Sequence, residues 1–65
     1  MTNCKVIKYG ENNMGIRGWF LEYFCDWKGY VTLEGRSGMA GYDTLEDALA
    51  WAKIYKMNVT AIEEH

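Results

Sequence analysis

The spacing of hydrophobic and polar positions along this chain changes once, near residue 42. Before that point, apolar and aromatic residues come in short runs separated by glycine, and all seven glycines lie at or before position 41. After it, apolar residues recur every three or four positions. Short runs divided by glycine are typical of strands and turns, and the later spacing is typical of an amphipathic helix. The pattern predicts strands followed by a helix.

Three segments before residue 42 have the composition of strands: 4–9, about 17–25 and about 30–34. They are rich in β-branched and aromatic residues, which favour strands. Residues 10–15 (GENNMG) are expected to form a loop, because Asn and Gly tolerate left-handed backbone conformations. Residues 26–29 (DWKG) are expected to form a type I turn closed by a left-handed glycine, which joins the second and third strands in a hairpin.

Residues 42–56 (YDTLEDALAWAKIYK) predict a helix. Thr44 or Asp43 can cap its first turn, and an acidic residue follows either of them three positions later. Lys53 and Lys56 lie in the last turns, where the helix dipole favours positive charge. The apolar stripe expected to face the core consists of Leu45, Ala48, Leu49, Ala52 and Tyr55.

Asn58 is expected to end this helix, and residues 59–63 (VTAIE) are expected to form the last strand. The order β-β-β-α-β predicts an α+β domain of two layers, with one helix packed on one face of an antiparallel sheet of three or four strands. Because 65 residues suffice for a single small core, residues 1–65 are expected to form one domain.

Six of the ten aromatic residues lie within residues 18–30. Side chains alternate between the two faces of a strand, so this segment should divide into two sets. The set expected beneath the helix is Trp19, Leu21, Tyr23, Val31 and Leu33. The set expected on the opposite face is Phe20, Phe24, Tyr30 and Thr32, edged by Glu22 and Glu34.

One helix cannot cover both faces of the sheet, so the fate of the second set is open. The loop at 10–15 or the glycine-rich segment 35–41 could fold over it, or two chains could form a homodimer through it. Alternatively, it could dock a partner, since exposed aromatic groups rimmed by polar residues mark interaction sites.

The charges exclude several classes of function. Seven basic and nine acidic residues give a net charge of −2, unlike the basic surface of a nucleic-acid binder. Residues 17–24 (RGWFLEYF) partly match an RNA-recognition signature, but Phe20, Leu21 and Glu22 depart from it, so no direct nucleic-acid binding is expected. The longest apolar run is five residues, so no membrane span is expected either.

The sequence offers little for catalysis. Its only histidine is the last residue, His65, and no metal-ligand spacing, phosphate-binding motif or paired nucleophile and base is present. We therefore expect no enzyme activity, no catalytic residues, no metal and no cofactor. Cys4 and Cys25 are too few for a disulfide framework, and a hairpin centred on 10–15 sets Cys4 opposite about Leu21. Free thiols and a location in the cytoplasm are expected.

The helix segment YDTLEDALAWA resembles part of a known class. Thr44, Leu45, Ala48 and Leu49 resemble the helix of a phage inhibitor of bacterial RNA polymerase, and the order of strands and helix is similar. More broadly, the chain resembles small phage proteins that disable host machinery, among them anti-CRISPR proteins. The last strand carries Ala61, Glu63 and Glu64 where the polymerase inhibitor has basic residues.

The resemblance implies a phage or mobile-element protein, acting in the bacterial cytoplasm, that blocks a host protein complex sterically in the manner of an anti-CRISPR protein. The target could be an effector that binds nucleic acid. Inhibition of RNA polymerase and a homodimeric structural module are the alternatives. The residues expected to contact the partner are Phe20, Glu22, Phe24, Asp26, Trp27, Lys28, Tyr30 and Glu34.

Overall fold

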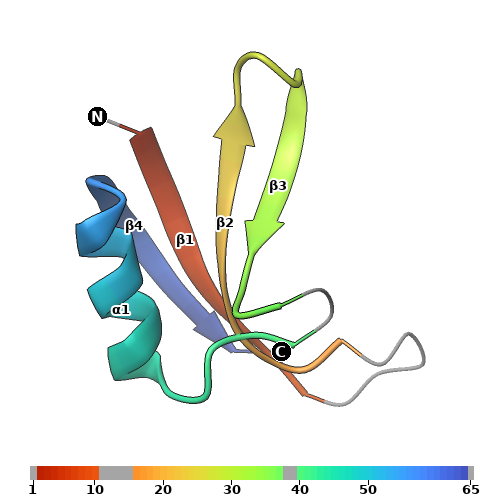
Figure 1. The fold of residues 1–65 in the computed structure, drawn as a ribbon, viewed down its shortest axis with the longest axis vertical. Coiled ribbons are helices and arrows are strands. Elements are labelled where there is room, and N and C mark those ends of the chain that lie inside the picture. The colour runs from red at the N-terminus through yellow and green to blue at the C-terminus, as the bar shows by residue number, and fades with distance from the viewer. Residues whose placement is uncertain (1, 11–15, 38–39, 65) are drawn as a thin grey trace.

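The structure is a computed structural model that describes residues 2–10, 16–37 and 40–64. It has the predicted α+β architecture, in which one helix packs on one face of a sheet (Figure 1). The elements in chain order are β1 (Thr2–Tyr9), β2 (Gly18–Cys25), β3 (Tyr30–Glu34), α1 (Leu45–Ile54) and β4 (Met57–Glu64). The predicted loop at 10–15 lies largely outside the described residues.

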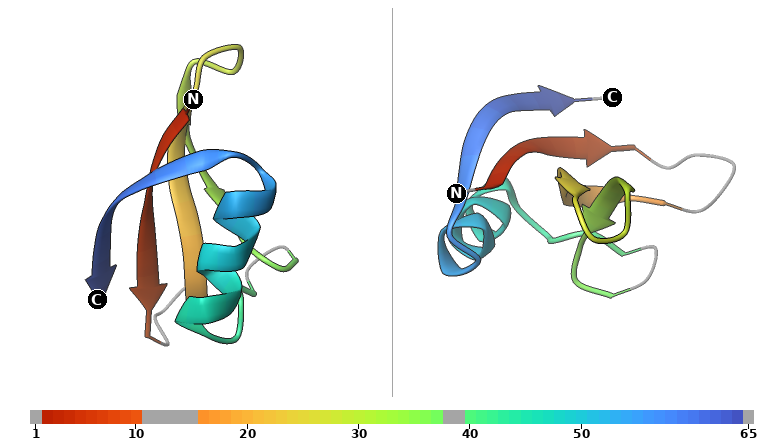
Figure 2. Two further views of the ribbon diagram at one scale, coloured as in Figure 1. Left: turned by 90° about the vertical axis from the view of Figure 1, so that its left-hand side faces the viewer. Right: turned by 90° about the horizontal axis from the view of Figure 1, so that it is seen from above.

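The sheet has four strands in the order β3-β2-β1-β4, so that β1 is central. It is mixed rather than wholly antiparallel, because β4 pairs with β1 in the parallel direction. The helix is the reason: β3 runs parallel to β1, α1 reverses the chain, and β4 therefore runs in the direction of β3 again. Figure 2 shows β4 crossing the end of α1 and then curving along the outer edge of β1.

The hairpin of β2 and β3 forms as predicted. Gly29 has a positive φ of 77° and its N–H donates to the carbonyl of Cys25 at 2.8 Å. This four-residue turn places Cys25 directly opposite Tyr30, and the ladder then runs from this pair to Leu21 opposite Glu34.

The ends of α1 follow local signals in the sequence. The Thr44 hydroxyl accepts a hydrogen bond from the N–H of Asp47 at 3.1 Å, which confirms the predicted cap. The helix ends at Ile54, and the chain turns at Lys56, whose φ is 58°. Asn58 was expected to end the helix, but it lies within β4, because the turn at Lys56 comes first.

The main core lies between α1 and the sheet. The buried residues that form it are Cys4, Val6, Leu21, Tyr42, Ala48 and Ala52. Trp19, Tyr23, Leu45 and Leu49 pack against it and are partly buried, as the alternation of β2 and the stripe of α1 predicted. Tyr55 was expected in the buried stripe, yet it remains 42% exposed. We call this side of the sheet the helix face and the other side the open face.

The sequence left open what covers Phe20 on the open face, and the glycine-rich segment does so, as one of the expected alternatives. Phe20 does belong to that face, since it pairs with Ile7, but it is only 2% exposed. The ring of Tyr9 meets it edge to face at 5.8 Å, and the glycine-rich segment lies against it at Gly35 and Gly41. A β-carbon built on either glycine would come within 2.9 Å of the Phe20 ring, so the missing side chains are what allow the cover.

The faces predicted for β3 are reversed. Val31 pairs with Phe24 and Leu33 with Glu22, so both side chains lie on the open face and not beneath α1. Thr32 pairs with Tyr23 and lies on the helix face, and Tyr30 lies on that face opposite Cys25. The cause is the four-residue turn, which pairs each odd-numbered residue of β2 with an even-numbered residue of β3.

Cys4 and Cys25 are both free, in agreement with the predicted absence of a disulfide. The register differs from the expected one by two residues, since Cys4 pairs with Tyr23 and not with Leu21. Burial raises the pKa of the Cys4 thiol, which keeps it protonated at neutral pH and makes it a poor nucleophile.

Candidate functional site

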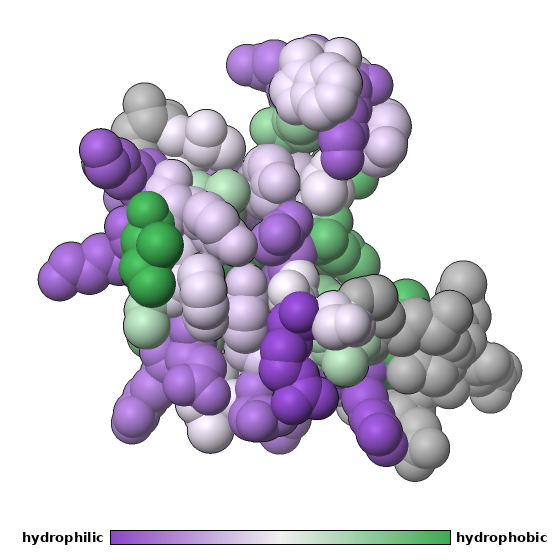
Figure 3. Space-filling view, viewed as in Figure 1, coloured by the Kyte–Doolittle hydropathy of each residue, from purple (hydrophilic) through white to green (hydrophobic). Residues whose placement is uncertain are grey.

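The outer end of the β2–β3 hairpin projects from the body of the protein. The ladder between β1 and β2 ends at the pair of Cys4 and Tyr23, so residues beyond Tyr23 pair only within the hairpin. We call residues 24–31 the arm. Figure 1 shows β2 and β3 rising away from β1, β4 and α1, and Figure 3 shows the end of the hairpin as a separate lobe.

The arm exposes large apolar side chains on all of its sides. Phe24 and Val31 are neighbours on the open face and are 54% and 57% exposed. Tyr30 is equally exposed on the helix face, and Trp27 at the tip is 85% exposed. The Lys28 ammonium lies 5.7 Å from the centre of the Trp27 ring, a cation–π contact that keeps a positive charge at the tip.

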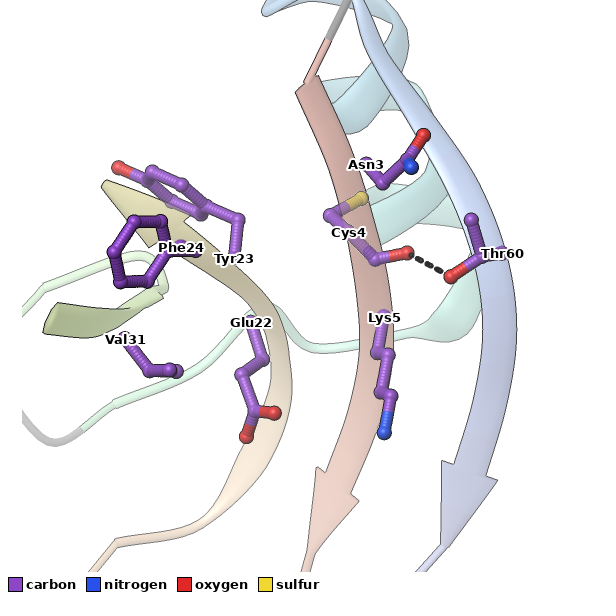
Figure 4. Close-up of a pocket in the computed structure, with 8 residues that line it drawn as sticks. All are labelled: Asn3, Cys4, Lys5, Glu22, Tyr23, Phe24, Val31 and Thr60. Atoms are coloured by element: carbon purple, nitrogen blue, oxygen red, sulfur yellow. Dashed lines mark hydrogen bonds between the residues drawn. The ribbon is translucent and has the colours of Figure 1, made fainter. Parts of the chain in front are cut away.

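A hollow of about 210 Å³ lies on the open face where the arm diverges from β1 (Figure 4). Phe24, Val31 and Glu22 line it from the hairpin, while Asn3 and Lys5 line it from β1. The walls therefore differ in character, because the rings and methyl groups come from the arm and the polar groups come from the central strand.

The hollow is also lined by Thr60 of β4. The Thr60 hydroxyl donates to the carbonyl of Cys4 at 3.2 Å, at the point where the register between the two strands shifts (Figure 4). Lys5 forms an ion pair with Glu63 at 3.4 Å, with both side chains substantially exposed. An exposed pair of this kind contributes little to stability, so Lys5 remains available to a ligand of the hollow.

The structure brings together only part of the predicted contact set. Phe24, Asp26, Trp27, Lys28 and Tyr30 all lie on the arm, as a group of exposed side chains. Phe20 is buried four residues before Phe24 and cannot contact a partner. Glu22 lines the hollow on the open face, and Glu34 lies on the helix face opposite Leu21, so the acidic residues do not form one surface.

Sequence reasoning missed Val31 and Leu33 as exposed residues of the open face. The signal was present, because the predicted turn at 26–29 already requires Cys25 to lie opposite Tyr30. Tyr55 was placed in the core stripe of the helix, but its side chain and that of Trp51 are about two-fifths exposed. Trp51 lies in the last turn of α1, and Tyr55 caps its C-terminal end.

Tyr42 is part of the buried core on the helix face. Its ring is 5% exposed and stacks on Trp51 with centroids 6.0 Å apart. Burial first, and then the neighbouring Tyr55 and Glu34 as well as Tyr23, raise the pKa of Tyr42 to about 12. Burial also raises the pKa of Tyr23, with a further contribution from Glu34. These phenols are therefore neutral hydrogen-bonding groups at physiological pH.

The raised pKa of Tyr42 predicts a loss of stability at alkaline pH. The unfolded chain releases this proton near pH 10, whereas the folded chain holds it until about pH 12, so the free energy of unfolding falls as the pH rises through this window. Tyr42 should account for about 1.4 kcal/mol of the loss between pH 8 and pH 11. The measurement is urea unfolding at both pH values for the wild type and for Tyr42→Phe.

The variant should lose correspondingly less stability between the two pH values, because it lacks the titrating hydroxyl. Cys4 and Tyr23 titrate in the same direction but are present in both proteins, so their effects cancel in the comparison. The same pH dependence in wild type and variant would contradict the prediction.

Residues 2–10, 16–37 and 40–64 contain no group of three or more His, Cys, Asp or Glu side chains placed to hold a metal ion. Within the same ranges, no helix has the length and apolar character needed to cross a membrane. The described surface presents exposed rings, a shallow hollow and scattered charges.

Comparison with known proteins found no matching family model, no similar curated protein and no similar solved structure.

Proposed function

We infer that this protein acts by binding another protein and blocking it sterically, with the arm as its docking element. The observation that carries this function is the position of the apolar side chains. Four exposed apolar side chains project beyond the pair of Cys4 and Tyr23 that ends the ladder between β1 and β2, and they contribute little to the core. They are Phe24, Trp27, Tyr30 and Val31. Exposed apolar side chains of this size lower solubility unless a partner covers them. Trp and Tyr are also the residues most often found at the energetic centre of an interface.

The partner that fits best is a bacterial host complex, such as an effector that binds nucleic acid, as the resemblance to phage inhibitors implies. The net charge of −2 suits a basic target surface, and Glu22 and Asp26 flank the apolar side chains of the arm. Opposite charges at the rim of an interface speed association and favour the right partner. An inhibitor of this kind needs no catalytic group, since occupying the site is sufficient.

The arm alone is too small to make a complete interface. Its four exposed apolar side chains present roughly 500 Å², given that an aromatic side chain can bury about 150–250 Å². A stable interface needs about 800 Å² from each partner. The contact must therefore continue onto the open face, the helix face or both.

The test compares two surface substitutions in binding to a bacterial lysate. Phe24→Glu places a charge on the arm, and Ile54→Glu places one on α1, where the side chain is similarly exposed at 62%. The immobilised wild type and Ile54→Glu should retain one and the same complex, and Phe24→Glu should lose it at least tenfold. A desolvated charge at the centre of an interface costs several kcal/mol, which is more than a tenfold loss of affinity requires.

The retained complex must then be purified and assayed. Addition of one equivalent of the wild type should inhibit its activity, and Phe24→Glu should not. Equal retention by both variants, or retention without inhibition, would overturn the proposed function. Light scattering of the purified protein separates the remaining case: a dimer that Phe24→Glu dissociates would make a second copy of this chain the occupant of the arm.

A further inference from the structure

Three aromatic rings form a cluster on the helix face. The rings of Tyr42 and Trp51 are nearly parallel, with an angle of 12° between them, and Trp51 packs on Tyr55 with centroids 5.6 Å apart. Tyr42 is buried at the base, while Trp51 and Tyr55 are 41% and 42% exposed. Figure 3 looks onto this side of the molecule, whose central surface is of intermediate hydropathy. The cluster thus leaves parts of the Trp51 and Tyr55 rings open to a ligand.

The carboxylate of Glu34 lies on the same face of the sheet as this cluster. Glu34 ends β3 on the helix face, opposite Leu21, and is half-buried. Along β2, Tyr42 pairs with Trp19 and Glu34 pairs with Leu21, and Tyr23 comes next on the same face. Glu34 also contributes to the raised pKa of both tyrosines. The carboxylate therefore lies in one region with Tyr23 and Tyr42, and the ring of Tyr42 joins this region to Trp51 and Tyr55.

The described part of the chain provides no cation for this carboxylate. The ion pairs among these residues are Lys5 with Glu63, Lys8 with Glu64 and Arg36 with Asp43. Arg36 is only two positions from Glu34, yet its guanidinium lies 3.8 Å from Asp43 instead. Among residues 2–10, 16–37 and 40–64, the half-buried carboxylate of Glu34 therefore forms no ion pair with a Lys or Arg side chain.

We propose that Glu34, Tyr23, Tyr55 and Trp51 form a subsite for an arginine side chain of the protein partner. This inference rests on the proposed function and names the chemistry of one of its contacts. A guanidinium stacks on an aromatic ring while its N–H groups donate to a carboxylate, and the planar group does both at once. A phosphate or a carboxylate is the wrong occupant, because Glu34 would repel it.

The position of the subsite extends the arm. Glu34 and Tyr23 lie on the same hairpin as Tyr30 and on the same face of it. A partner that binds the helix face of the arm at Tyr30 contacts the subsite as well if its interface extends along β2 and β3 toward α1. The subsite thereby supplies part of the interface area that the arm lacks.

The test uses the tripeptide Gly-Arg-Gly, blocked at both ends, as the probe and the same peptide with citrulline as the neutral match. Nuclear magnetic resonance should show saturable shifts of the Trp51 indole N–H and the Tyr55 ring signals with the arginine peptide. Citrulline has the same shape without the charge, so its shifts should be at least about fivefold smaller at equal concentration, because both the cation–π contact and the ion pair are lost.

Two substitutions of the same kind locate the binding. Glu34→Gln keeps the size of the side chain and should weaken binding of the arginine peptide at least about fivefold. Glu22→Gln removes a charge from the open face and should change it less than about twofold, since that residue lies on the other side of the sheet. Equal binding of both peptides, shifts away from Trp51 and Tyr55, or no effect of Glu34→Gln would overturn the inference.

The outcomes separate this inference from the proposed function. Retention of the host complex that depends on Phe24, without binding of the arginine peptide, would remove the subsite and leave the docking arm. Binding of the peptide at Trp51, with retention that does not depend on Phe24, would keep the subsite and remove the arm.

Discussion

Phe20→Ala is expected to remove most of the stability of this protein. Truncation of a fully buried Phe costs about 3–5 kcal/mol, which includes the cavity that it leaves. A domain of this size has little more than about 5 kcal/mol in total. The ring also ties the glycine-rich segment to β1 and β2, because it contacts Tyr9 and packs against Gly35 and Gly41. Urea unfolding followed by far-ultraviolet circular dichroism measures the loss.

Phe24→Ala is the matched control. It removes the same ring from the same face of the same strand four residues later, where the ring is 54% exposed. We expect it to cost no more than about 1 kcal/mol, as for other substitutions outside the core. Similar losses of stability for the two variants would contradict the difference in burial between Phe20 and Phe24.

Gly41→Ala is expected to cost about 3 kcal/mol, although it adds only one methyl group. A β-carbon at this position would lie 2.5 Å from the carbonyl oxygen of Trp19 and 2.7 Å from its nitrogen. Backbone atoms of a strand cannot move aside as a flexible side chain can. Three hydrogen bonds join the two segments here: Gly41 N–H to Arg17, Tyr42 N–H to Trp19 and Trp19 N–H to Tyr42. Some of them must break to relieve the overlap.

Gly29→Ala serves for comparison. It has a positive φ of 77°, but no atom lies within 4 Å of its would-be β-carbon. Only the backbone preference is lost, at about 1 kcal/mol. Amide hydrogen exchange gives a second readout, since Gly41→Ala should speed exchange at Tyr42 and Trp19 and Gly29→Ala should not. A smaller loss of stability for Gly41→Ala than for Gly29→Ala would contradict the close approach of the glycine-rich segment to β2.

Local signals predicted most of the elements well. The turn at 26–29 was located by its terminal glycine, and the helix start was located by Thr44 and the acidic residues after it. The bounds of β3 agree with the prediction, and those of β1, β2 and β4 differ by one or two residues at their ends. These features depend on interactions between residues a few positions apart, which a sequence displays directly.

The candidate site was predicted less completely. The exposed residues of the arm were found because a turn rich in polar residues must lie outside the core. Phe20 was assigned to the right face, but its cover was left open and it was counted among the partner contacts although it is buried. Alternation along β2 says which side a residue faces and nothing about what lies over it. The wrong face of Val31 and Leu33 came from treating two strands separately, although the length of their turn decides how they pair.

The sequence by itself determined the α+β class, the hairpin, the helix and its cap, because the chemistry responsible is local. Only the tertiary structure decided that β4 joins β1 in parallel, that the glycine-rich segment covers Phe20, and that Glu34 lies on the same face as Tyr23 and Tyr42 while Glu22 faces the opposite side. Each of these depends on residues distant in the chain, whose contact is set by strand register and by the space that glycine leaves open. The result is a small body with a covered core and an uncovered arm.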